Sequence, residues 1–183
     1  MLNRKSRLLL YGADLSAFSE GMFGPFLAIF TERIGGSLLD IAWAWAIYLI
    51  VSGALIMVIG RWSDYKKRKE YFNIAGFGLE ALFIFGYLFV SSPLHLFIVQ
   101  AGLGVAAALS VPTWDALYAK YEDHRHAGRS WGLVDGQMQM FSGVAIIMGG
   151  SLVGYFSFTA LFLTMGIIQT IATFYQILLL RKR

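Results

Sequence analysis

The sequence contains no cysteine, only 3 prolines, and few charged residues for a chain of 183. The absence of cysteine excludes disulfide bonds and thiolate metal sites within this sequence. Charged residues make up 14% of it, whereas soluble domains carry about a quarter. A chain that is 57% hydrophobic, with a mean hydropathy of +0.62, is suited to lipid rather than water as its main solvent. We therefore predict an all-α integral membrane protein.

Apolar windows of about 20 residues, long enough to cross the hydrocarbon core as helices, occur six times. The predicted membrane-spanning helices, in one domain of residues 1–183, cover residues 8–30, 40–61, 71–91, 94–119, 131–155 and 157–180. The first follows the basic stretch MLNRKSR, as a signal peptide would. Its apolar part is too long for a signal peptide, contains Asp14 and Glu20, and has no small-residue cleavage site, so we expect a retained helix.

The basic residues are distributed unequally between the two sides of these helices. Fourteen of the 15 lie before the first helix, after the last, or in the loops that follow the second and fourth, and Arg33 alone lies in the other loops. By the positive-inside rule, both termini should be cytoplasmic in a cell (plasma) membrane protein. The same topology explains the basic clusters without a nucleic acid as a partner.

The loop GRWSDYKKRK, residues 60–69, is the most basic segment, with five of the 15 basic residues. Topology alone accounts for its lysines and arginines. Topology does not account for Gly60 and Asp64, because the positive-inside rule requires neither a glycine nor a carboxylate. These two residues therefore need another explanation.

This loop resembles the signature motif of the major facilitator superfamily, in which a glycine and an aspartate precede a basic turn that ends in Arg-Lys, here Arg68 and Lys69. Tyr65 and Lys67 depart from that motif, which usually has a basic residue and a glycine there. The segments VQAGLGVAAALSVPTWDAL and GGSLVGYFSFTALF also resemble this family, so the resemblance covers essentially the whole chain. The arginine often found early in the fourth helix and the full antiporter-type Gly-Pro pattern of the fifth are absent.

The resemblance implies a secondary transporter of a small molecule that works by alternating access. Family members usually have twelve helices in two halves with the substrate site between them, and this chain corresponds to one half. The first and fourth helices should line the cavity, the second and fifth should face the other half, and the third and sixth should lie outside. We expect no cofactor and no enzyme, since neither a nucleotide-binding loop nor a catalytic constellation is present. One subunit of a heterodimeric split transporter and a non-transporting membrane scaffold remain alternatives.

Glycines in the fifth predicted helix are spaced at intervals of 4, 7, 7 and 4, which places them along one stripe. They are Gly132, Gly136, Gly143, Gly150 and Gly154. Such stripes let helices approach closely in lipid, either within one bundle or between two chains. Together with the half-length resemblance, the stripe favours a parallel homodimer, with Asp135 and Gln139 beside the interface.

In that homodimer, the family resemblance implies a latch on the cytoplasmic side. A carboxylate at the end of one helix is stabilised by the positive N-terminus of another. We expect Asp64 of one subunit to meet the start of the fifth helix of the second copy, near Arg129 and Gly132.

Polar residues inside membrane helices are costly unless they face a cavity or a partner. Glu20 lies near the middle of the first helix, one turn after Ser16, and we predict a role in substrate binding or proton coupling. The alternative is a protonated carboxyl group that is hydrogen-bonded inside the bundle. Asp14 is a second coupling candidate, although it lies about 120° around the helix from Glu20.

The other polar candidates lie on the third and fourth helices. We expect Gln100, Trp114 and Asp115 to line the cavity, with Asp115 toward the cytoplasm. Glu80 is near the midplane, but the family resemblance places its helix at the periphery, which favours a structural role. We expect no metal site, because no further ligands stand at metal-binding spacing from His124 and His126.

Overall fold

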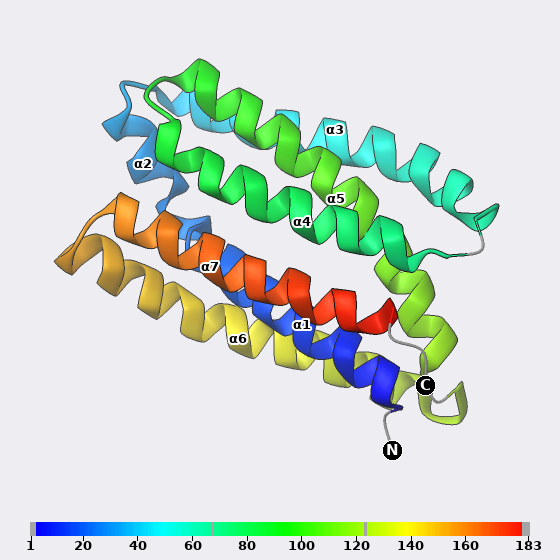
Figure 1. Ribbon diagram of the computed structural model, residues 1–183. Helices are drawn as coiled ribbons and strands as arrows, with labels where there is room; N and C mark the ends of the chain where they lie inside the picture. Colours follow the sequence, from blue (N-terminus) through cyan, green and yellow to red (C-terminus); the bar gives the residue numbers. More distant parts are fainter. Residues whose placement is uncertain (1–2, 67, 123, 181–183) are drawn as a thin grey trace.

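The computed structural model describes residues 3–66, 68–122 and 124–180, apart from the His124 side chain, and nearly all of them are helical (Figure 1). The main helices are α1 (Arg4–Gly21), α2 (Leu27–Arg33), α3 (Leu38–Asp64), α4 (Glu70–Gly86), α5 (Pro93–Tyr121), α6 (Ala127–Tyr155) and α7 (Phe158–Ile177). Short 3₁₀ turns lie between or after them, namely η1 (Gly24–Phe26), η2 (Tyr87–Phe89), η3 (His124–His126) and η4 (Leu178–Leu180).

Five of these helices, with their 3₁₀ extensions, are long and apolar enough to cross a membrane. They are α3, α4, α5, α6 and α7, and their ends lie within four residues of the predicted ones. The all-helical, membrane-spanning fold class is therefore confirmed. The count of six spans and the cytoplasmic side of the termini remain predictions.

The prediction of one continuous first helix over residues 8–30 was wrong. α1 ends at Gly21, the turn η1 follows, and α2 has only seven residues. Pro25 lies at the start of η1 and has no N–H to donate, and in a continuous α-helix its ring would clash with the carbonyl group four residues before it. The Gly24-Pro25 pair therefore divides the predicted span into two helical segments.

Serine side chains begin three of the spanning helices. Ser37 accepts a hydrogen bond from the Asp40 backbone N–H, and the Asp40 carboxylate accepts one from the Ser37 N–H, which forms a capping box at α3. Ser92 and Ser157 cap α5 and α7 in the same position. These caps satisfy N–H groups that have no partner within the helix, and they set where each helix starts.

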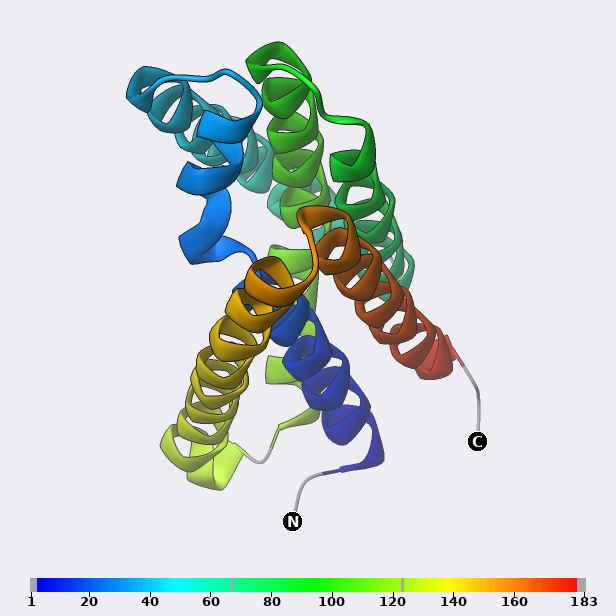
Figure 2. The same cartoon turned by 90° about the vertical axis from the view of Figure 1, so that its left-hand side faces the viewer.

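The helices pack as two groups of three. α5 packs along α3 and α4, while α1 packs along α6 and α7, and contacts between α4 and α7 join the groups (Figures 1 and 2). Thus α1, from the first half of the chain, packs with helices of the second half, and α5, from the second half, packs with helices of the first. This exchange is what two inverted three-helix repeats produce.

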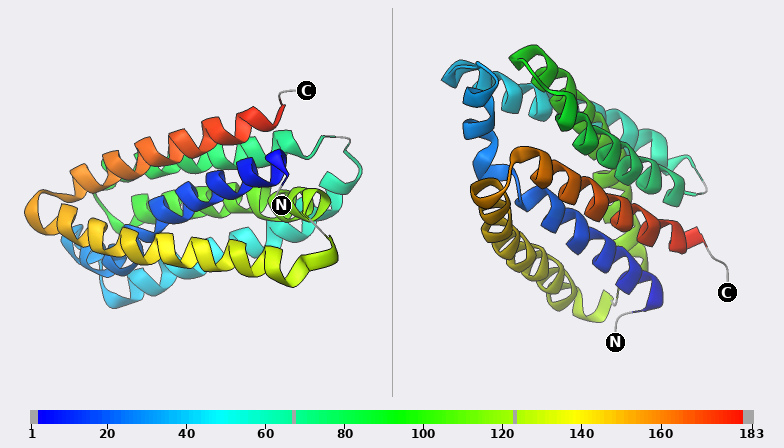
Figure 3. Two further views of the ribbon diagram at one scale, coloured as in Figure 1. Left: turned by 90° about the horizontal axis from the view of Figure 1, so that it is seen from below. Right: turned by 60° about the vertical axis from the view of Figure 1, so that its left-hand side comes forward.

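α3 and α6 lie on opposite sides of the bundle, with the other helices between them (Figure 3). Only 11% of the most apolar window of each is buried, against 33 to 44% for α4, α5 and α7. Most of the surface of these two helices is therefore available to lipid or to another protein.

α1 and α6 pack tightly near the end of α1. The Ser142 hydroxyl donates to the Ala17 carbonyl over 3.2 Å, and the rings of Phe18 and Phe141 meet edge to face. Gly149 lies directly against the Met22 carbonyl, so closely that no side chain would fit between them. This seam holds α6 beside the interruption that follows α1.

Candidate functional site

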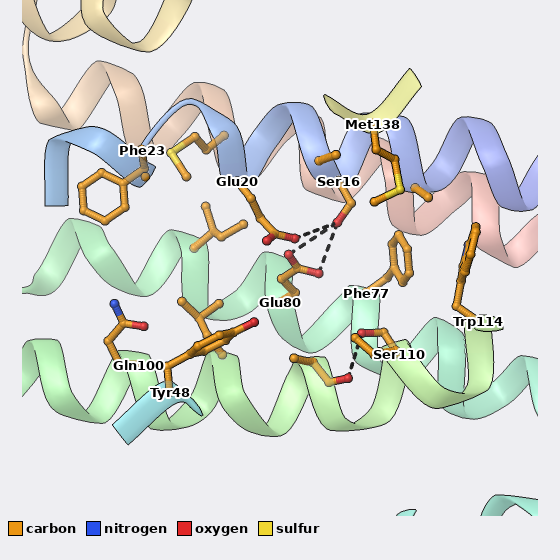
Figure 4. Close-up of a pocket in the computed structure, with 18 of the residues that line it drawn as sticks. Ser16, Glu20, Phe23, Tyr48, Phe77, Glu80, Gln100, Ser110, Trp114 and Met138 are labelled. Carbon is orange, nitrogen blue, oxygen red and sulfur yellow. Dashed lines mark hydrogen bonds between the residues drawn. The ribbon is translucent and has the colours of Figure 1, made fainter. Parts of the chain in front are cut away.

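A cavity of about 470 Å³ lies between the two groups of helices (Figure 4). Residues of α1, α3, α4, α5, α6 and α7 line it, together with residues of the segment around η1. Most of the lining is apolar or aromatic. Trp45, Asp115 and Asp135 line the cavity yet are exposed, so it opens to the molecular surface between α3 and α6.

The charged groups of the cavity are all acidic. Four carboxyl groups line it, those of Glu20, Glu80, Asp115 and Asp135. Among the described lining residues there is no lysine, arginine or histidine. A cavity of this kind attracts positive charge, because its carboxylates are surrounded by low-dielectric apolar walls.

Glu20 and Glu80 form a pair in the middle of the cavity. The Ser16 hydroxyl lies 3.4 Å from Glu20 Oε1 and from both carboxylate oxygens of Glu80. On the far side, Gln169 of α7 donates to Glu80 Oε2 over 2.7 Å. The two carboxyl groups are close enough to interact directly. Glu80 is buried and Glu20 is exposed on the cavity side, and two neighbouring carboxyl groups are costly inside a bundle of membrane helices unless they serve a function.

Glu80 is a functional candidate for which the sequence analysis favoured a structural role. The family pattern placed its helix at the periphery and favoured a structural role, whereas Glu80 is 8% exposed, lines the cavity and approaches Glu20. The signal that could have found it was its position as an isolated carboxylate in an apolar helix. Which face of α4 points inward depends on the packing of α5 and α7.

Asp14 does not reach the cavity. Its side chain is buried, and it is absent from the lining although Ala13, Ser16 and Ala17 of the same helix belong to it. Its Oδ1 atom has no hydrogen-bond partner among the described residues. This position agrees with the expected angle around α1, which directs Asp14 away from Glu20, and the role of Asp14 as a second coupling candidate stays a prediction.

The structure brings Gln100, Trp114 and Asp115 of α5 into the lining. Trp114 stacks on Tyr118 with ring centroids 5.1 Å apart, and its indole N–H donates to the Leu9 carbonyl. Trp131 packs edge-on against both rings. This aromatic cluster joins α1, α5 and α6 at the end of the cavity nearer the chain termini.

Three residues that were expected at or beside the dimer interface differ in their surroundings within the single chain. Asp135 lines the cavity, facing the same space as Asp115, while Gln139 is exposed and outside it. Gly150 faces its own subunit, because a Cβ there would lie 3.1 Å from the Phe26 ring.

The other four glycines of the stripe face open space. A Cβ added at Gly132, Gly136, Gly143 or Gly154 would meet no heavy atom within 4 Å. Packing within the single chain therefore does not explain these four glycines.

In the loop after α3, Asp64 forms a salt bridge with Lys69, and both residues belong to the motif identified in the sequence. Arg68 donates a hydrogen bond to the Tyr71 hydroxyl. A Cβ added at Gly60 would lie 3.8 Å from the Pro112 Cβ of α5. Arg129 is exposed near the start of α6. In the single chain Asp64 thus binds within its own loop, and Lys67 lies outside the described residues.

Among the described residues there is no group of three or more histidine, aspartate or glutamate side chains that could hold a metal ion.

Comparison with known proteins places this architecture in a family. The sequence profile of the Major Facilitator Superfamily matches residues 9–183. The uncharacterized MFS-type transporter YitZ of Bacillus subtilis (strain 168) is 26% identical over 146 residues, which are 79% of this chain and 88% of YitZ. The multidrug resistance protein MdtH of Enterobacter sp. (strain 638) is 30% identical over 70% of this chain and 30% of MdtH. The multidrug resistance protein MdtG of Dickeya zeae (strain Ech586) is 24% identical over 90% of this chain and 41% of MdtG.

The chain thus spans most of YitZ and less than half of MdtH and of MdtG. The profile match covers nearly all of the chain, including every helix that lines the cavity. The protein therefore belongs to the Major Facilitator Superfamily of membrane transporters.

Proposed function

We propose that this protein is a secondary active transporter of a small organic molecule that works by alternating access and is driven by protons. The observation that carries the proposal is the Glu20–Glu80 pair, in which Ser16 bridges a buried Glu80 to an exposed Glu20 in the wall of a mostly apolar cavity. Two neighbouring carboxyl groups that face a cavity can take up and release a proton when water access changes sides. Proton movement would then be linked to the conformational cycle.

A small organic substrate agrees with the cavity. Its volume of about 470 Å³ is within the range of small-molecule sites, and its walls are mostly apolar. MdtH and MdtG are named multidrug resistance proteins, and we propose a substrate of the same general kind for this chain.

We further propose a parallel homodimer of six-helix subunits in the cell membrane, with both termini cytoplasmic. The interrupted segment α1–η1–α2 would be the first of the six spans. Three observations support the dimer: α3 and α6 are the least buried spanning helices, the cavity opens between them, and four glycines of α6 face open space. The MFS-type transporter YitZ, which this chain nearly covers, shows that the family includes proteins of similar length.

In the homodimer, α3 and α6 of the second copy would close the open side of the cavity. Asp64 would exchange its partner Lys69 for the start of α6 in the second copy, near Arg129, when the cytoplasmic side closes.

Transport tests the first proposal. Protein reconstituted in proteoliposomes should accumulate or expel members of a small-molecule panel when a pH gradient is imposed. Glu20→Gln and Glu80→Gln should abolish the pH-driven component, because neither amide can carry the proton. Glu32→Gln, at an exposed position of α2 that does not line the cavity, should keep it. Unchanged pH-driven flux in both cavity variants would refute the coupling role, and no flux with any panel member would favour the scaffold.

Crosslinking tests the homodimer, and the chain is well suited to it because it has no native cysteine. Met140→Cys on α6 and Met57→Cys on α3 place single thiols on exposed positions of the proposed interface. Leu82→Cys on α4 is the matched control, since it is also exposed but lies outside that interface. Short bifunctional reagents should link the first two variants in lipid and not the third. The absence of dimers for both would contradict the homodimer and favour a different second subunit.

A further inference from the structure

The cavity contains buried polar groups that the proton pathway does not use. Gln100 is 6% exposed and Tyr87 is 3% exposed, and both line the cavity. Neither the Gln100 amide nor the Tyr87 hydroxyl has a hydrogen-bond partner among the described residues. None of their polar atoms is fully enclosed without a partner, so both groups are open to the cavity. Unpartnered groups that face a cavity therefore indicate where a ligand makes its polar contacts.

These groups gather around Glu20, away from the Trp114 end of the cavity. The Tyr87 ring packs on Phe23, three residues after Glu20, with centroids 4.9 Å apart. Tyr87 and Tyr48 both lie within electrostatic reach of the Glu20 carboxyl group. In Figure 4, Gln100 and Tyr48 project from α5 and α3 toward the space that Glu20 enters from α1. Asp115 is fifteen residues further along α5, about 22 Å away.

The chemistry of this end selects a donor with positive charge. The Glu20 carboxylate can only accept hydrogen bonds, whereas the Gln100 amide and the Tyr87 hydroxyl can accept as well as donate, so all three can accept from one N–H head. The described lining has no basic side chain that could neutralise Glu20. Between this region and Asp115 and Asp135, the cavity wall is mostly apolar, with groups such as Phe77, Met138 and Trp114. A ligand that fits both regions has a cationic N–H head and an apolar body.

We propose that Glu20, Gln100 and Tyr87 form a head-group site for a protonated amine that carries at least one N–H. The apolar or aromatic body of the amine lies against Phe77 and Met138, toward the Trp114 end of the cavity. This inference rests on the proposed function, and it names the substrate class that the transport proposal leaves open.

A pair of probes that differ by one N–H tests the site. Tritiated N,N-dimethyl-1-naphthylmethylamine is a protonated tertiary amine at pH 7, and its N,N,N-trimethyl analogue is a quaternary ammonium with the same charge and ring. Equilibrium binding is measured on the purified protein in nanodiscs, with empty nanodiscs subtracted. The tertiary amine should bind about tenfold more tightly, which corresponds to about 1.4 kcal/mol, because only it can donate to these acceptors. Equal or tighter binding of the quaternary probe would overturn the proposal.

Substitutions locate the site within the cavity. Tyr87→Phe keeps the ring that stacks on Phe162, and Gln100→Met keeps a similar volume, so both variants should fold. Each should weaken tertiary-amine binding about fivefold and change quaternary binding less than twofold. Tyr175→Phe removes a hydroxyl of α7 outside the cavity and should change neither. Wild-type preference in both cavity variants would overturn the assignment of these residues.

The binding experiment and the transport experiment test the two proposals independently. A tertiary-amine preference without pH-driven flux would leave the head-group site in place and refute the proposed function. Flux driven by the pH gradient, with no preference between the two probes, would refute the site and leave the proposed function standing.

Discussion

The contact between Gly149 and the end of α1 allows a sharp test of the packing that shapes the cavity. A Cβ at position 149 would lie 2.0 Å from the Met22 carbonyl oxygen and 2.8 Å from its carbonyl carbon. Ordinary contact begins at 3.4 Å, so the clash with the oxygen amounts to about 1.4 Å. Both atoms belong to the backbone, and no side-chain rotation relieves the overlap. Gly149→Ala must therefore push α6 away from α1.

Overpacking of this kind lowers the free energy of unfolding by about 1–3 kcal/mol, and the higher helix propensity of alanine offsets up to about 1 kcal/mol of that loss. We expect Gly149→Ala to lower the free energy of unfolding by about 1–2 kcal/mol. Gly143→Ala is the matched control on the same helix, because its Cβ would meet nothing within 4 Å. That variant should leave the stability of the subunit unchanged or raise it by up to about 1 kcal/mol.

The assay is unfolding of the purified subunit in mixed micelles, followed by far-UV circular dichroism as the fraction of denaturing detergent rises. Measurements at high dilution keep the dimer from contributing. Equal unfolding midpoints for Gly149→Ala and Gly143→Ala would refute the close α1–α6 seam, and with it the position of α6 in the cavity wall.

Three further predictions concern single interactions. Gln169→Leu should lower the free energy of unfolding by about 1–3 kcal/mol because Glu80 loses its α7 donor, whereas the double variant with Glu80→Leu should recover much of that loss in a double-mutant cycle. Asp64→Asn removes the exposed salt bridge to Lys69 and should change thermal stability by less than about 1 kcal/mol. It should reduce transport, because we propose that Asp64 acts as the latch. A large loss of stability would contradict this prediction. Ser37→Ala removes the capping box of α3 and should cost about 1 kcal/mol in detergent unfolding, and no loss would argue against the cap.

The spanning helices could be predicted almost completely from the sequence. Lipid provides no hydrogen bonds for the backbone, so each crossing must be a long helix, and apolar windows of the right length reveal it. The predicted range 94–119 and the observed α5, Pro93–Tyr121, differ by only one or two residues at each end. The interruption after α1 was not predicted because hydropathy is averaged over a window, although the Gly24-Pro25 pair was visible in the sequence.

The candidate site was only partly predictable. Angles within one helix follow from 3.6 residues per turn, so the separation of Asp14 from Glu20 could be calculated in advance. Relations between helices could not. The pairing of Glu20 with Glu80 depends on how α4 is rotated against α1, and the hydrophobic pattern of α4 does not define that rotation because lipid and protein core are equally apolar.

By itself, the sequence determined that the chain is suited to lipid, where five spanning helices begin and end to within four residues, and which residues are too polar for lipid without a partner. The tertiary structure alone decided which of those residues meet: Ser16, Glu20 and Glu80 in one cavity with Gln100 and Tyr87, and Asp14 apart from them. The physical reason is that helix formation in a membrane is imposed locally by the backbone, residue by residue. The rotation of one helix against another depends instead on side-chain contacts between distant segments, such as Gly149 on Met22 and Gln169 on Glu80.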